Sequence, residues 1–159
     1  MLASLAAARL TRYRRICWPF LSLIFWGAFS CSLFAAEIQK EAANFFLNGR
    51  QAYAEKRFDA AASAFESAAA AAPTNDEYVY WVGKAHGRRA ETAGWLTAIQ
   101  IAPLARVAFE RAIELNPNNW DAVSDLAQYY DDAPGFLGGD KTKAAALRSR
   151  LLRSAAPAR

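Results

Sequence analysis

One pattern of residues occurs twice between residues 42 and 119, and it constrains the fold more than any other feature of the chain. In each copy a bulky residue and a glycine are followed by an alanine, an aromatic residue, a second alanine and a proline. Gly49 and Gly83 lie 34 residues apart, which is the length of one helix–turn–helix repeat. Phe65 and Phe109 lie 44 residues apart. The sequence therefore predicts stacked helical pairs, with an insertion of about ten residues in the second pair.

Helical periodicity marks the first two helices of this region. Apolar residues recur at steps of three and four over residues 37–56, which predicts a helix there. Residues 60–72 are nearly all alanine, the residue with the highest helix propensity, and Pro73 is expected to end this second helix. Because small side chains let helices approach closely, we expect Phe65 to be the large side chain packed between the two.

Polar residues at the expected helix starts predict the caps. Asp59 is the expected N-cap of the second helix. Thr74 and Glu77 have the spacing of a capping box at the start of the third helix. Asp140 is expected to cap a last helix over residues 141–154.

The repeated pattern resembles that of tetratricopeptide repeats, and a third, degenerate copy follows the first two. This resemblance implies an all-α solenoid of about three helix–turn–helix repeats, the number at which stacked pairs bury a continuous core. The pattern is carried by Phe45, Gly49, Ala61, Phe65, Ala68 and Pro73, then by Val79, Val82, Gly83, Ala105, Phe109, Ala112 and Pro117, then by Val123, Leu126, Ala127 and Tyr130. The expected repeats are residues 42–75, residues 76–119 with an insertion at 90–103, and residues 120–154 with a Gly-rich turn at 133–139.

The head of the chain has the character of a signal peptide or a single transmembrane anchor. Residues 1–15 carry bases and no acid, and residues 16–36 are uncharged and mostly apolar, long enough as a helix to cross a bilayer. The bases favour export of the part that follows. Two alternatives stay open: cleavage before Glu37, or retention in the inner membrane, which the bulky Phe34 near the cleavage position favours. A third candidate, a lipoprotein site at Cys31, lacks the usual aliphatic residue.

We therefore divide the chain into residues 1–36, the targeting or anchoring segment, and residues 37–159, a helical domain expected to be periplasmic or otherwise extracytoplasmic. The formal net charge of +4 belongs to the head, because four arginines precede the apolar run and the other 15 bases balance 15 acids. A neutral domain offers no basic face to phosphates, so no nucleic-acid partner is expected. From Asp140 onward, however, six bases accompany one acid.

No catalytic, cofactor or metal site is predicted, and we expect the protein not to be an enzyme. His86, the single histidine, takes an aromatic core position of the second repeat, so it is expected to be packed between helices. Both cysteines, Cys17 and Cys31, lie in the head, which leaves the domain without a thiolate site. A Ser/His/Asp arrangement would have to use the core histidine. The Gly-Gly pair before Lys141 lacks the spacing of a phosphate-binding loop.

The insertion at residues 90–103 is longer than an ordinary turn between helices and contains Trp95, Leu96, Ile99 and Ile101. We expect a loop that folds back and covers the edge of the solenoid. The alternative is an apolar contact for a partner or a membrane surface.

The resemblance implies that the first helix of each pair lines a concave face where peptides bind. Arg50, Lys84 and Arg88 stand beside aromatic residues on this face, which suits an acidic or C-terminal peptide segment; the alternative is that these are ordinary solvated residues. The expected groove residues are Phe46, Arg50, Tyr53, Tyr80, Lys84, Arg88, Ser124 and Gln128, with Glu77, Asp121 and Asp131 beside them.

The expected function is that of a non-catalytic scaffold or adaptor of the bacterial cell envelope, which binds a protein or peptide partner. The two interruptions and the stretch at residues 87–93 resemble an uncharacterised bacterial subgroup of tetratricopeptide proteins. The alternative is a structural homo-oligomer that associates through the Trp95 insertion or the basic C-terminal helix. The sequence does not identify the partner.

Overall fold

The computed structural model describes the backbone of residues 18–155 and the side chains of residues 36–155. The chain divides into two units, Met1–Ile38 and Gln39–Arg159, and the second unit is described below. The expected signal or anchor segment lies, up to residue 35, outside the described side chains. Within the described residues, no helix combines the length and the apolar character that crossing a membrane requires.

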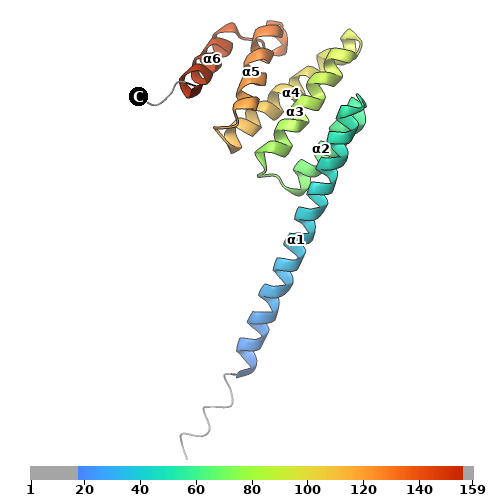
Figure 1. The fold of residues 1–159 in the computed structure, drawn as a ribbon, viewed down its shortest axis with the longest axis vertical. Coiled ribbons are helices and arrows are strands. Elements are labelled where there is room, and N and C mark those ends of the chain that lie inside the picture. Colours follow the sequence, from blue (N-terminus) through green and yellow to red (C-terminus); the bar gives the residue numbers. More distant parts are fainter. Residues whose placement is uncertain (1–17, 156–159) are drawn as a thin grey trace, which may run out of the picture. The chain divides into compact units, whose positions relative to one another are not determined.

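Six α-helices pack in sequential pairs along the described residues, which confirms the prediction of an all-α fold (Figure 1). Helix α1 packs on α2, α3 on α4 and α5 on α6, and α2 and α4 also contact the next pair. A short 3-10 helix, η1, precedes the last helix. The bounds are α1 (Trp18–Ala54), α2 (Phe58–Ala71), α3 (Asp76–Thr92), α4 (Trp95–Leu115), α5 (Trp120–Asp132), η1 (Gly135–Leu137) and α6 (Lys141–Ala155).

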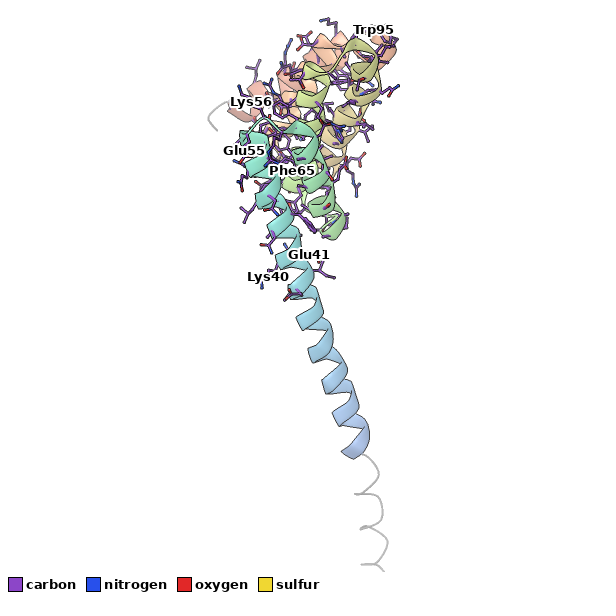
Figure 2. All side chains as sticks on the ribbon, turned by 90° about the vertical axis from the view of Figure 1, so that its right-hand side faces the viewer. Lys40, Glu41, Glu55, Lys56, Phe65 and Trp95 are labelled. Atoms are coloured by element: carbon purple, nitrogen blue, oxygen red, sulfur yellow. The ribbon has the colours of Figure 1, made fainter. Side chains whose placement is uncertain are left out.

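The same close contact holds the first and the second helical pair together. A Cβ atom added to Gly49 would lie 2.6 Å from the ring of Phe65, and one added to Gly83 would lie 2.6 Å from the ring of Phe109. Both phenylalanines are buried. Figure 2 shows Phe65 among the helices of the first pair, so its prediction as the packed aromatic residue is confirmed. Only glycine lets the facing ring approach this closely, which explains why glycine and phenylalanine occur together in both copies of the pattern.

His86 is buried, as predicted, with 4% of its surface exposed. Its Nε2 lies 2.9 Å from a carboxylate oxygen of Glu66 on α2, and its Nδ1 lies 3.2 Å from the guanidinium of Arg89. Arg89 Nε donates to the carboxylate of Asp59, 2.7 Å away. Burial lowers the pKa of His86, the Glu66 carboxylate opposes this effect, and the positive charge of Arg89 adds to it. The four side chains therefore form a polar network between α2 and α3 around a neutral imidazole.

Two of the predicted caps are wrong by one or two residues. Helix α2 begins after Arg57, because Lys56 takes a left-handed conformation, with φ of 59°, that ends α1 early. Asp59 therefore lies inside the first turn of α2 and binds Arg89 instead of capping. Helix α3 is capped by Asn75, whose side-chain oxygen accepts a bond from the Tyr78 N–H at 3.2 Å.

The predicted cap of the last helix is confirmed. The Asp140 carboxylate accepts bonds from the N–H groups of Thr142 at 2.9 Å and Lys143 at 3.1 Å. The Gly-rich turn before α6 is hydrogen-bonded to α5, since the Asp140 N–H donates to the carbonyl of Tyr130 at 2.9 Å. This turn thereby fixes α6 against α5.

The prediction of a loop at residues 90–103 is wrong. Helix α3 continues to Thr92 and α4 already begins at Trp95, so the insertion lengthens both helices of the second pair. Pro103 lies inside α4 and, because it lacks an N–H, costs that helix one backbone hydrogen bond. Trp95 does not cover the edge of the packed helices, because 72% of its surface is exposed at the end of the domain where α3 turns into α4 (Figure 2).

Candidate functional site

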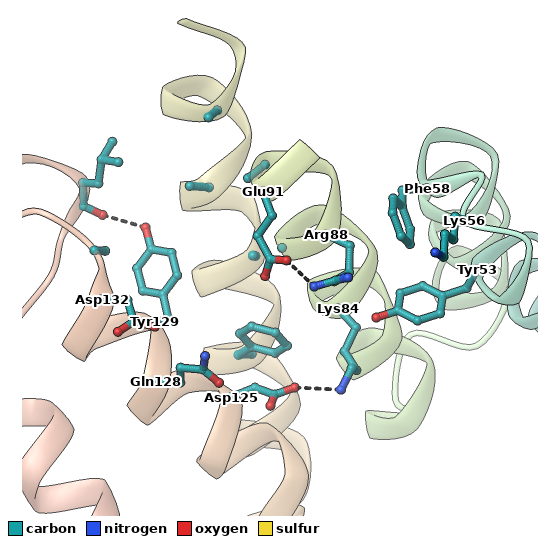
Figure 3. A pocket seen from close by; sticks show the side chains of 18 of the residues that line it. Tyr53, Lys56, Phe58, Lys84, Arg88, Glu91, Asp125, Gln128, Tyr129 and Asp132 are labelled. Carbon is teal, nitrogen blue, oxygen red and sulfur yellow. Dashed lines mark hydrogen bonds and ion pairs between the residues drawn. The ribbon is translucent and has the colours of Figure 1, made fainter. Parts of the chain in front are cut away.

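A groove with a volume of about 810 Å³ lies between α3 and α5, and we call it the α3–α5 groove (Figure 3). Helix α4 forms its floor, with small side chains along most of its length. The two flanking helices supply the walls, and the α1–α2 turn and the segment after α5 extend them. The floor consists of Ala98, Ala102, Ala105 and Phe109, and the helical walls of Lys84, Gly87, Arg88, Ala90 and Glu91 on α3 and of Asp125, Gln128, Tyr129 and Asp132 on α5.

The insertion builds the outer part of this groove. Four of its members line the groove, two on the α3 wall and two on the α4 floor: Ala90, Glu91, Ala98 and Ala102. Three of these four are alanines, so the lengthened helices provide space as well as length. The α4 floor could have been recognised in the sequence, because Ala98, Ala102 and Ala105 are four and three residues apart, the spacing of one helix face.

An ion pair between the walls closes the inner end of the groove. Lys84 Nζ lies 3.3 Å from the Asp125 carboxylate, which also accepts a hydrogen bond from the Tyr80 hydroxyl at 3.1 Å. Burial raises the pKa of Tyr80 to about 12. Burial acts to lower the pKa of Lys84, but the hydrogen bond with Tyr80 and the charge of Asp125 outweigh it and raise the pKa. Lys84 is therefore a protonated side chain already committed to Asp125.

The outer end of the groove carries exposed charges. Arg88 forms an ion pair with Glu91 on the same helix, and its guanidinium carbon lies 5.6 Å from the centre of the Phe58 ring. On the opposite wall the Tyr129 hydroxyl donates to the carbonyl of Leu137 at 2.8 Å, which holds the segment after α5 in place. The Arg88 pair is solvent-exposed and therefore weak, so both of its members are available to a ligand.

The groove is electrically neutral as a whole but has walls of opposite sign. Three cations and one acid on the α1–α3 side give a formal charge of +2, and two acids on the α5 side give −2. These residues are Lys56, Lys84, Arg88 and Glu91 on one side and Asp125 and Asp132 on the other. A surface with both signs differs from the cationic surface expected from the sequence.

The predicted groove residues fall into two sets. Those that line the α3–α5 groove are Tyr53, Lys84, Arg88 and Gln128, and those that do not are Phe46, Arg50, Tyr80 and Ser124. Ser124 is exposed on α5, whereas Tyr80 is buried below the Lys84–Asp125 pair.

Trp81, which the sequence analysis did not single out, explains why Phe46 and Arg50 of α1 lie outside the groove. Its ring centre lies 6.3 Å from that of Phe46 and 5.3 Å from that of Tyr53. The Arg50 guanidinium carbon stands 4.0 Å from the centre of the same ring. The space between α1 and α3 is thus filled by an aromatic cluster with a cation stacked on it.

Asp125 was also missed, although it lies next to the predicted Ser124. The difference of one position corresponds to a rotation of α5 by about 100° about its axis. The packing of α5 on α4 sets that rotation, since the Tyr130 hydroxyl donates to Glu110 of α4 at 2.5 Å. A pattern match to a repeat does not contain this contact.

Among the described residues, no three side chains of His, Cys, Asp or Glu come together in an arrangement that could hold a metal ion. No protein-family model matches the chain, and no curated protein is significantly similar to it.

Proposed function

We propose that the chain is a binding module of the tetratricopeptide type, which holds a segment of a partner protein in the α3–α5 groove. The observation that carries this proposal is the groove itself, an open channel of about 810 Å³ with a floor of alanines and charged walls. Apolar floors with polar rims are typical of peptide-binding surfaces. The repeated Gly–Phe contacts of the first two pairs support the relation to tetratricopeptide repeats.

The proposed role is non-catalytic and needs no cofactor. Both ring nitrogens of His86 already have partners in the network between α2 and α3. Lys84 is paired with Asp125, so it is a poor candidate for a free nucleophile. Binding without chemistry is the function that such a lining supports.

The proposed location is the bacterial cell envelope, outside the cytoplasm. This part of the proposal rests on the basic and apolar head of the sequence. The location is tested by fusing to the C-terminus a reporter enzyme that is active only in the cytoplasm. Activity of this fusion would contradict the proposed location. N-terminal sequencing of the mature protein distinguishes cleavage before Glu37 from retention of an inner-membrane anchor.

Partner capture by groove variants tests the binding role. Ala102→Leu places a larger side chain on the floor of the groove, whereas Ala146→Leu makes the same change at an exposed position of α6. We expect full-length protein to retain a specific partner from detergent-solubilised envelopes with Ala146→Leu and to lose it with Ala102→Leu. Equal capture by both variants would show that the partner does not use the groove.

Self-association is the second candidate function, and the exposed Trp95 and Leu96 favour it, with 72% and 62% of their surfaces accessible. Large apolar side chains at a protruding turn are typical of contact surfaces. Light scattering of the full-length protein tests this alternative. A mass that falls when both residues are changed to serine would support it, and an unchanged monomer in both proteins would remove it.

A further inference from the structure

We infer that the occupant of the α3–α5 groove is an amphipathic α-helix, with an apolar stripe flanked by acidic side chains along one edge and basic side chains along the other. This inference rests on the proposed function, and it specifies the conformation and the charge pattern of the partner segment. It differs from the acidic or C-terminal segment that the sequence favours.

The floor has the dimensions of a helix-packing surface. Ala98, Ala102, Ala105 and Phe109 follow one another at steps of four, three and four along one face of α4. At 1.5 Å per residue this face is about 16 Å long, or three helical turns. Helix axes pack about 8–10 Å apart, and the shorter distances require small side chains at the contact. Three alanines in series provide that surface for an apolar stripe.

An extended peptide would find no backbone partners on the floor of this groove, whose side chains are all apolar. The walls and the floor are helices whose own backbone groups are already bonded, so they offer no strand edge. The polar side chains of the described lining, the amide of Gln128 among them, stand on the walls and not on the floor. Backbone polar groups buried against alanines without hydrogen-bond partners are unfavourable, whereas a helix satisfies these groups internally.

The walls define the charges of the occupant. Near the open end the α1–α3 side carries Lys56, Arg88 and Glu91, a formal charge of +1, and the α5 side carries Asp132. Acids along one edge of a guest helix would face the first side, and bases along the other edge would face the second. A helix with a single sign on both edges would meet repulsion at one wall. The neutral total of the groove therefore favours a partner with both signs.

The insertion makes this occupant specific to the second helical pair. Without residues 90–103 the floor would lose Ala98 and Ala102, and the α3 wall would lose Ala90 and Glu91. About one and a half turns of the floor would disappear, leaving too short a surface for a guest helix. The insertion that lengthens α3 and α4 thus also supplies the surface on which the guest helix docks.

Synthetic peptides of about four helical turns test the inference directly. The first probe carries a leucine stripe with glutamates along one edge and lysines along the other. The second and third probes have the same stripe, with glutamates on both edges or with lysines on both. The fourth is the first probe with two central residues replaced by proline, which prevents a continuous helix. Fluorescence anisotropy is measured with full-length protein in detergent, and the signal of Ala102→Leu is subtracted so that uptake into micelles cancels.

We expect the mixed-edge helix to bind, and each single-sign helix to bind about fivefold more weakly at low salt, a gap that narrows as salt rises. Ala98→Leu should abolish the same binding, and Ala146→Leu should leave it unchanged. Equal binding of the proline probe would overturn the inference of a helix while leaving the groove as a peptide site. Stronger binding of the all-glutamate probe would overturn the charge pattern. Absence of any binding would overturn the inference, and partner capture with Ala102→Leu would still test the proposed function separately.

Discussion

Lys84 and Asp125 meet across the closed end of the α3–α5 groove, with 3.3 Å between the ammonium nitrogen and the carboxylate oxygen. Each side chain is about two-thirds buried, and Tyr80 supplies a second partner to the same carboxylate. The pair joins the second helical pair to the third, and it marks the point from which the two walls extend. The Lys84–Asp125 ion pair therefore contributes to the stability of the domain and also sets the distance between the two walls at this end of the groove.

Asp125→Asn tests this link. The substitution removes the charge that Lys84 faces, so we expect the free energy of unfolding to fall by about 1–3 kcal/mol. Asp132→Asn is the matched control, because Asp132 is an exposed groove residue on the same helix. Denaturant titration of the full-length protein in detergent measures both changes. An equal effect of the two substitutions would show that the pair across the groove has no special weight.

Glycines in the helix contacts provide a second prediction. Gly49→Ala and Gly83→Ala place a Cβ atom 2.6 Å from a phenylalanine ring, so each should destabilise the domain by about 1–3 kcal/mol. A Cβ at Gly87 meets none of the described atoms within 4 Å, and Gly87→Ala should stabilise α3 by about 0.5–1 kcal/mol. Thermal unfolding followed by circular dichroism gives the order of the three variants. Similar losses in all three would contradict the close contact.

The buried histidine predicts a dependence of stability on pH. Its pKa is lowered in the folded state, so below the ordinary value of 6.5 the unfolded chain binds more protons at His86 than the folded chain. The free energy of unfolding should therefore fall as the pH decreases through about 6.5. The charged side chains that face the ring are Glu66 and Arg89.

His86→Gln is the control for the pH prediction, since it keeps a polar side chain and removes the titration. Urea midpoints of the wild type and the variant should converge as the pH falls from neutral to acidic values. A wild-type midpoint that is constant across this range would be inconsistent with a neutral imidazole in the folded protein.

The turn before α6 gives a fourth prediction. A Cβ atom at Gly139 would lie 1.7 Å from the carbonyl oxygen of Ala133, so Gly139→Ala forces the backbone of this turn to move. Gly135→Ala meets none of the described atoms within 4 Å and serves as the control. Because Pro134 and Leu137 line the groove, we expect Gly139→Ala to weaken both the docking of α6 and the binding of the mixed-edge peptide. Faster amide exchange in α6 than in the control would report the first effect.

Much of the fold was predictable because it depends on contacts that the sequence repeats. The Gly49–Phe65 and Gly83–Phe109 contacts, the burial of His86 and the cap at Asp140 all follow from residue type and spacing. Such features depend on local geometry and on the fact that a glycine, which has no side chain, leaves room for a large ring on the facing helix.

The site was less predictable because it depends on how far helices extend and how they rotate. The length of the insertion favoured a loop, but alanines on both sides of the turn at Gly94 allow two long helices. The face between α1 and α3 was expected to be open, and Trp81 closes it. Such outcomes follow from side-chain volumes at tertiary contacts, which a single repeat pattern does not contain.

The extension of α3 and α4 has a wider consequence. The contact between Gly83 and Phe109 fixes the base of this hairpin, while residues 90–103 lie beyond it. The tip can therefore gain or lose turns without disturbing the way in which neighbouring pairs stack. In a stack of helical pairs, the length of one hairpin is thus independent of the packing between pairs, and the proposed binding groove could change its ligand preference while the stack stays the same.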